Sequence, residues 1–169
     1  MAFKKTPEVP STERAQAHYK ELSLAAANIN TASDELGEAI SALDATLKKL
    51  NLGISAWSKL AGSEHPDGEY WSRDVGYTKV GNKWGIALRT TSGNFNYGEG
   101  DEEVWLFNEA PRWLRIEAVG SIPDLLEALV KRAEETTEKI KKKTKQAFEL
   151  AAAIKAVEES EAAEQEGQK

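Results

Sequence analysis

The sequence contains no cysteine, and this absence excludes a disulfide framework, a thiolate zinc site and a cysteine nucleophile together. Only two histidines are present, His18 and His65, and neither has a second histidine at metal-site spacing. No apolar run approaches the roughly 18 residues of a membrane span, and the N-terminus lacks the apolar core of a secretory signal. These absences predict a cytoplasmic protein that does not enter a membrane, and we expect it to use no metal and no cofactor.

Positive charge is also in short supply. The 22 Lys and Arg residues against 28 Asp and Glu give a net charge of −6, whereas a general nucleic-acid binder carries a basic face. The lysine-rich run at 139–145 is the local exception, but residues 122–160 as a whole hold eight positive and eight negative charges. We interpret the run as a solvated helix surface rather than a phosphate-binding track, so nucleic acid is not an expected partner.

Aromatic residues are scarce at both ends of the chain and concentrated in its middle. Residues 53–120 hold all five tryptophans, ten of the thirteen aromatic residues and most of the glycines, while the flanks are rich in Ala, Glu and Lys. This contrast predicts an α+β protein with a single domain, in which two helical flanks enclose a β insert at 53–120. Residues 1–10 and 161–169 are predicted to be flexible tails, the second of them acidic.

The first flank, residues 11–52, has the apolar periodicity of a long helix. Residues at alternating spacings of four and three form a seam over about five heptads: Ala15, Tyr19, Leu22, Ala26, Ile29, Ser33, Leu36, Ile40, Leu43, Leu47 and Leu50. The pattern predicts one continuous helix, about 58 Å long at 1.5 Å per residue, which stops before Gly53. The alternative is a pair of helices with a break between Asn30 and Asp34.

The second flank, residues 121–160, repeats this pattern after a possible N-cap at Ser121. Its seam consists of Leu126, Leu129, Ala133, Thr136, Ile140, Lys143, Ala147, Leu150, Ile154 and Val157. Each stripe has to be buried, and the nearest surface is the other helix. The sequence therefore predicts that 11–52 and 121–160 form an antiparallel, coiled-coil-like helical hairpin with the β insert at its tip. In this hairpin Leu22 lies near Leu150, and Ile29 lies near Lys143.

The β insert is predicted to be a four-stranded antiparallel meander followed by a short helix. The expected strands are 54–60, 69–80, 83–91 and 102–108, with a long loop from Ser92 to Asp101. A helical turn or two is expected to start at residues 108–111 and to end at Gly120. The dipeptide Gly81-Asn82 is typical of a two-residue hairpin turn. That turn pairs Val80 with Lys83 and thereby fixes the register of the hairpin.

This register sorts the hairpin into an apolar face and a small, polar face. On the second face Asp74 lies across from Arg89, and Gly76 and Gly85 lie nearby. Two glycines on one face indicate that something approaches the backbone closely: a packed helix, a second copy of the chain or a ligand. Alternatively, the Asp74–Arg89 ion pair has only a structural role, in which case it contributes roughly 0.2–1 kcal/mol to the stability of the sheet. The candidate partner- or ligand-binding residues are Asp74, Arg89, Gly76, Gly85, Trp71, Phe95, Tyr97 and Arg112.

No catalytic motif accompanies these residues. A phosphate-binding loop, a nucleophile elbow and a calcium-loop spacing are all absent from the sequence, so we assign no catalytic residue and no metal ligand. The aromatic residues of the insert exceed what one face of a small sheet buries, and such side chains often anchor interfaces. We therefore predict a non-enzymatic interaction or assembly protein that forms a homodimer or a larger homo-oligomer and binds a protein partner through its β insert and helical arms. The alternative is a protein that sequesters a small ligand or a nucleotide, using the Asp74/Arg89 face and the Phe95–Tyr97 loop.

Overall fold

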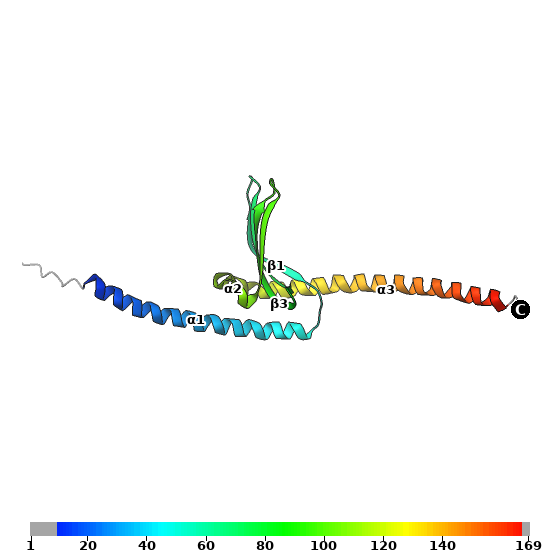
Figure 1. Ribbon diagram of the computed structural model, residues 1–169, viewed down its shortest axis with the longest axis horizontal. Helices are drawn as coiled ribbons and strands as arrows, with labels where there is room; N and C mark the ends of the chain where they lie inside the picture. The colour runs from blue at the N-terminus through cyan, green and yellow to red at the C-terminus, as the bar shows by residue number, and fades with distance from the viewer. Residues whose placement is uncertain (1–9, 167–169) are drawn as a thin grey trace, which may run out of the picture.

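The computed structural model describes residues 10–166 (Figure 1). The tail predicted at 1–10 therefore lies outside the described residues except for Pro10, as do residues 167–169. The protein has the predicted α+β composition, and its elements follow in the order α1 Ser11–Lys49, β1 Ala56–Glu64, β2 Glu69–Val80, β3 Lys83–Asn94, β4 Glu99–Leu106, the 3₁₀ turn η1 Phe107–Glu109, α2 Arg112–Ala118, the 3₁₀ turn η2 Val119–Ser121 and α3 Ile122–Glu166.

The four strands form one antiparallel sheet in the order β1-β2-β3-β4, as predicted. The predicted hairpin register is confirmed: Val80 pairs with Lys83, and Asp74 pairs with Arg89. Gly81 takes a φ of +56°, the left-handed conformation that the tight turn requires. This two-residue turn thus sets the pairing of two 12-residue strands.

The predicted loop from Ser92 to Asp101 is wrong for most of its length. β3 continues to Asn94 and β4 begins at Glu99, and the two strands pair through Gly93 and Gly100. Only residues 95–98 form the turn. β1 likewise runs to Glu64 instead of ending at residue 60. Pairing with neighbouring strands overrides the weak β propensity of Ser, Gly and Asn in these segments.

The hydrophobic core lies at one end of the sheet, where all three helices gather, and it is built on the face of the sheet that we call the inner face. This inner face carries Val75, Tyr77, Ile86 and Leu88, all of which are buried. Leu114 of α2 and Leu125 of α3 are fully buried against it, and Ile40 of α1 joins the same cluster. The other end of the sheet, with the turns at 65–68 and 95–98, projects away from the helices (Figure 1).

α1 is one continuous helix of 39 residues, as predicted, and the alternative break between Asn30 and Asp34 is not present. Its C-terminal part is bound to β3 and η1. Immediately after the helix, Asn51 and Gly53 both take positive φ values, 48° and 62°, and the chain turns back towards the sheet. The helix thus ends before Gly53 as predicted, and Asn51 and Gly53 supply the left-handed conformation of the turn that follows it.

The predicted antiparallel helical hairpin is wrong. α1 and α3 run in the same direction, are displaced along their length, and extend to opposite sides of the sheet (Figure 1). α1 packs on β3, whereas α3 packs on β1 and β2. Leu22 and Leu150, which the hairpin would bring together, are both exposed. The physical reason is that the sheet and α2 offer each helix a closer apolar surface than the other helix does.

α3 also extends beyond the predicted helix end at residue 160. It remains helical to Glu166, which corrects the predicted flexible tail over residues 161–166. The apolar pattern fades there, but Ala, Glu and Gln are good helix formers and continue the helix without it. Among residues 10–166, none of the helices is both long enough and apolar enough to cross a membrane.

Candidate functional site

The Asp74–Arg89 pair forms as predicted, on the outer face of the sheet, which is the face opposite the core. Arg89 Nε donates a hydrogen bond to Asp74 Oδ2 over 3.3 Å, and Ser72 Oγ donates to the same oxygen over 3.1 Å. Asp74 is only 7% exposed. Arg89 also lies 3.5 Å from Glu102 and stacks on the Trp57 ring at 4.3 Å. Arg89 is therefore paired within the chain, with a carboxylate on each of two neighbouring strands.

The two glycines of the outer face are approached by residues of the chain itself. A Cβ atom at Gly76 would lie 2.3 Å from the Trp57 ring of the neighbouring strand. A Cβ atom at Gly85 would lie 3.2 Å from Asp44 of α1, and a similar distance from Leu106. The prediction of a close approach is thus confirmed, with a neighbouring aromatic ring at one glycine and a packed helix at the other.

The remaining candidate residues lie in other parts of the molecule. Trp71 faces Arg73, whose guanidinium lies 4.6 Å from the Trp71 ring centroid and donates to Glu117 of α2 over 2.7 Å. Arg112 donates to Asn30 of α1 over 2.8 Å. Both arginines thus connect α2 to its surroundings, one to the sheet and one to α1.

Phe95 and Tyr97 lie in the turn between β3 and β4, where both are exposed. Phe95 stacks on Tyr70 with ring centroids 4.2 Å apart. Phe95 is six residues further along the chain than Arg89, which corresponds to about 20 Å along an extended strand. The predicted ion-pair face and the predicted aromatic loop therefore do not converge on one small-molecule pocket.

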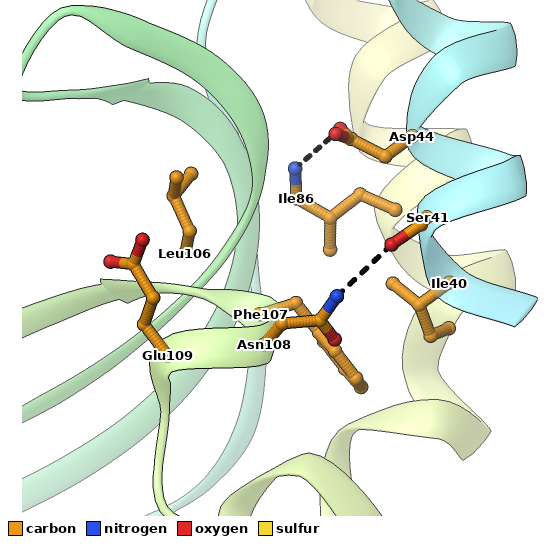
Figure 2. Close-up of a pocket in the computed structure, with 8 residues that line it drawn as sticks. All are labelled: Ile40, Ser41, Asp44, Ile86, Leu106, Phe107, Asn108 and Glu109. Carbon is orange, nitrogen blue, oxygen red and sulfur yellow. Dashed lines mark hydrogen bonds between the residues drawn. The ribbon is translucent and has the colours of Figure 1, made fainter. Parts of the chain in front are cut away.

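A cavity of about 220 Å³ lies where α1 meets β3 and η1 (Figure 2). Asp44 accepts a hydrogen bond from the backbone N–H of Ile86 over 2.9 Å, and Asn108 Nδ2 donates to Ser41 Oγ over 3.0 Å. β4 ends at Leu106, which pairs with Ala87, so β3 has no neighbouring strand beyond that pair. Asp44 accepts the hydrogen bond of a backbone N–H in this unpaired part of β3. Burial, and next the charge of Asp44, raise the pKa of Tyr77. The polar groups of this cavity form the hydrogen bonds that attach α1 to β3 and η1, so we interpret it as part of the packing of α1 and not as a ligand site.

A second, more open cavity of about 400 Å³ lies near the projecting end of the sheet, between Tyr70, Trp71 and Asp101. Its lining includes His65, but no cluster of three or more metal-ligating side chains occurs among residues 10–166. The side chains around it that form hydrogen bonds, such as Asn94, are engaged with the backbone of the adjacent turn.

The longest continuously exposed stretches among the described residues lie on the two long helices where they leave the sheet. Residues 11–32 of α1, which we call the N-terminal arm, are all exposed, including the seam residues Tyr19, Leu22 and Ile29. Residues 137–166 of α3 form the C-terminal arm, and residues 137–162 of it are likewise all exposed. The apolar seam of that arm consists of Ile140, Ala147, Leu150, Ile154 and Val157.

Both seams were predicted from the sequence, but they were predicted to pack against each other in a helical hairpin. In the structure the α1 seam is buried at Ser33, Ile40 and Leu47, and the predicted α3 seam is buried at Leu129. The predicted α3 seam residue Leu126 is 42% exposed, and its neighbour Leu125 is buried in the core instead. Beyond those residues both stripes face solvent, for example at Leu22 (65% exposed) and Ile154 (64% exposed). Contiguous exposed apolar surface of this kind marks protein interaction sites.

No protein-family model, curated protein or solved structure gives a significant match to this chain. The assignment of function therefore depends on the physical properties of these surfaces. Sequence reasoning missed that the arms are free within one chain. One feature of the sequence could have indicated this: the charge of residues 137–166 changes from basic to acidic along the arm, whereas the N-terminal arm carries no matching charge pattern.

Proposed function

We propose that this protein is a non-enzymatic assembly protein that self-associates through its two helical arms. The observation that carries the proposal is the pair of exposed apolar seams, one on each arm. A single chain buries the middle of its α1–sheet–α3 framework and leaves the seams uncovered at both ends. The exposed Phe95 and Tyr97 at the projecting turn give the β insert a smaller surface for a further protein partner.

The energetics of isolated helices support this proposal. Helices draw most of their stability from packing of their apolar face, and short isolated helices are marginal in water. The N-terminal arm has 22 residues that receive no cover from the sheet. Burying one leucine or isoleucine side chain contributes about 1.5–3 kcal/mol. Several such residues on each arm therefore provide a strong driving force for association.

The arrangement of charged groups supports a binding role over a catalytic one. Asp74 and Arg89 neutralise each other on the outer face, and an ion-paired carboxylate does not suit a general base. The arms extend to opposite sides of the sheet, so partners can occupy both without competing for space (Figure 1). This geometry is suited to linking copies of the chain.

The proposal is tested with two matched double variants. Leu22→Lys with Ile154→Lys places a charge in both seams, whereas Leu24→Lys with Phe148→Lys places the same charges on exposed apolar residues outside the seams. Leu24 is 66% exposed, almost the same as Leu22, so the comparison isolates the position on the helix. Each lost seam contact of about 1.4 kcal/mol or more weakens association at least tenfold.

Light scattering on size-exclusion fractions reports the mass of each variant. We expect the seam variant to fall to the 18.6 kDa of one chain, while the control variant retains the mass of the unmodified protein. Equal masses for the two variants would show that the seams are not the association surface.

A further inference from the structure

The C-terminal arm carries two opposite charge blocks of equal length. Residues 138–146 contain five lysines and one glutamate, a net charge of +4. Residues 158–166 contain five glutamates and no basic residue, a net charge of −5. Between them lies the apolar part of the seam, Leu150 and Ile154, which is exposed. The arm is thus a basic segment, an apolar centre and an acidic segment on one continuous helix.

This order of charges selects one mode of self-pairing. Two such arms side by side in the same direction would place lysine against lysine and glutamate against glutamate, which is destabilising. Two arms in opposite directions place each basic block beside the acidic block of the other arm. The N-terminal arm is no equivalent partner, because Glu13 and Glu21 balance Arg14 and Lys20 and leave it neutral.

We propose that the C-terminal arm binds the same arm of a second copy as an antiparallel coiled coil centred on residue 152. This inference rests on the proposed function, because it identifies the partner of one of the two arms. Centring the pair on residue 152 aligns 138–146 of one copy with 158–166 of the other over their full length. The overlap of residues 138–166 corresponds to about 43 Å of helix.

The heptad seam fits this register. The seam residues pair between copies as Leu150 with Ile154, Ala147 with Val157, Lys143 with Glu161, and Ile140 with Glu164. The central layers are therefore apolar, the layer that follows is an ion pair, and the outermost layer places an isoleucine beside a glutamate. Lys143 was a misfit in the seam of the predicted hairpin, where it faced Ile29, but it has an opposite charge here. A shift by one heptad would instead place Lys143 against Ile154.

The body of the protein also leaves room for the pair. Thr136 is half-buried, and every residue of α3 from 137 to 162 is exposed. In the proposed register the end of the partner helix, residue 166, reaches residue 138. The overlap therefore starts where the helix becomes free of the sheet, and the whole C-terminal arm is used.

The absence of cysteine makes a direct test possible, because an introduced thiol is the only thiol in the chain. One preparation carries Lys143→Cys and another carries Glu161→Cys, and the two are mixed at equal concentration under mild oxidation. A disulfide requires Cα atoms about 4.4–6.8 Å apart. We expect the mixture to form a disulfide between the two variants and each variant alone to form little.

A matched control uses Lys145→Cys with Glu159→Cys. These two residues also lie opposite each other in the proposed pair, each seven residues from residue 152, but they point away from the seam, so we expect no disulfide. Lys143→Cys linking to itself would show parallel arms and overturn the inference, and linking of Lys143→Cys to Ile154→Cys in place of Glu161→Cys would overturn the register.

Light scattering on the unmodified chain separates the two levels of the argument. A dimer without the Lys143–Glu161 link overturns the antiparallel pairing and leaves the proposed function standing. A monomer throughout the micromolar range overturns both. Because the blocks attract through charge, we also expect the dimer to weaken as salt is raised.

Discussion

Trp57 sets the character of the outer sheet face. Its ring occupies the space that a side chain at Gly76 would need, and the guanidinium of Arg89 stacks on the same ring. Arg89 is in turn held by Asp74. Gly76 is therefore a glycine because the Trp57 ring of the adjacent strand leaves no space for a side chain. The ion pair with Asp74 holds the Arg89 guanidinium in place on that ring.

Replacing Gly76 with alanine tests this arrangement. Alanine normally favours a strand over glycine by about 0.5–1 kcal/mol, but here its Cβ would lie 2.3 Å from the Trp57 ring. Overpacking of this kind costs about 1–3 kcal/mol. We therefore expect Gly76→Ala to lower the free energy of unfolding in urea by about 1 kcal/mol or more. Gly120→Ala is the control, since nothing lies within 4 Å of a Cβ there, and equal effects at the two positions would contradict the account.

At the scale of elements, α1 is attached to the rest of the molecule by polar contacts along one stripe. Arg112 donates to Asn30, Arg115 donates to Ser33, and the Asn108 side chain donates to Gly37 and Ser41. These contacts explain why the polar residues in the middle of the predicted seam are tolerated. They face α2 and η1, and Ser33 is buried there.

Asp44 is the contact whose loss has the clearest consequence. Asp44→Ala leaves the backbone N–H of Ile86 without its acceptor at the edge of β3. An unsatisfied donor of this kind costs about 1–3 kcal/mol, against a gain of up to about 0.7 kcal/mol in helix propensity. We expect a lower urea midpoint for Asp44→Ala than for Asp44→Asn, which keeps an acceptor oxygen. The same midpoint for both variants would show that this hydrogen bond does not contribute to stability.

The elements that could be predicted are those whose determinants are local. Gly81 and Asn82 specify a two-residue turn, and the turn alone fixes which residues of β2 and β3 oppose each other. The continuous α1 follows from a seam uninterrupted by proline. The strand ends at 92–94 and 99–101 were missed because their Ser, Gly and Asn residues form strands only through pairing with neighbours.

At the scale of the whole molecule, the predicted hairpin failed for a different physical reason. An apolar seam shows that a helix needs a partner but does not identify the partner, because any apolar surface covers it equally well. Ile40 and Leu129 pack in the core formed by the sheet and α2, whereas the outer parts of both seams are exposed. The presence of a seam on each helix therefore did not indicate that the helices pair with each other.

The candidate site was predicted in part. Asp74, Arg89, Gly76 and Gly85 were placed on one face by the register, and the structure confirms that placement. Trp71, Arg112 and the turn of Phe95 and Tyr97 depend on how α2 and the far end of the sheet are arranged, which no local pattern specifies. For the same reason, the exposure of the two arms could not be predicted from the sequence, since exposure depends on how the whole chain folds.

The central claim is that this chain associates with itself, and the mass of the unmodified protein in solution tests it most directly. Sedimentation equilibrium across the micromolar range measures that mass without assuming a shape for the elongated molecule. The exposed seams on both arms predict a mass of at least twice the 18.6 kDa of one chain. A mass of 18.6 kDa at every concentration in that range would contradict the account.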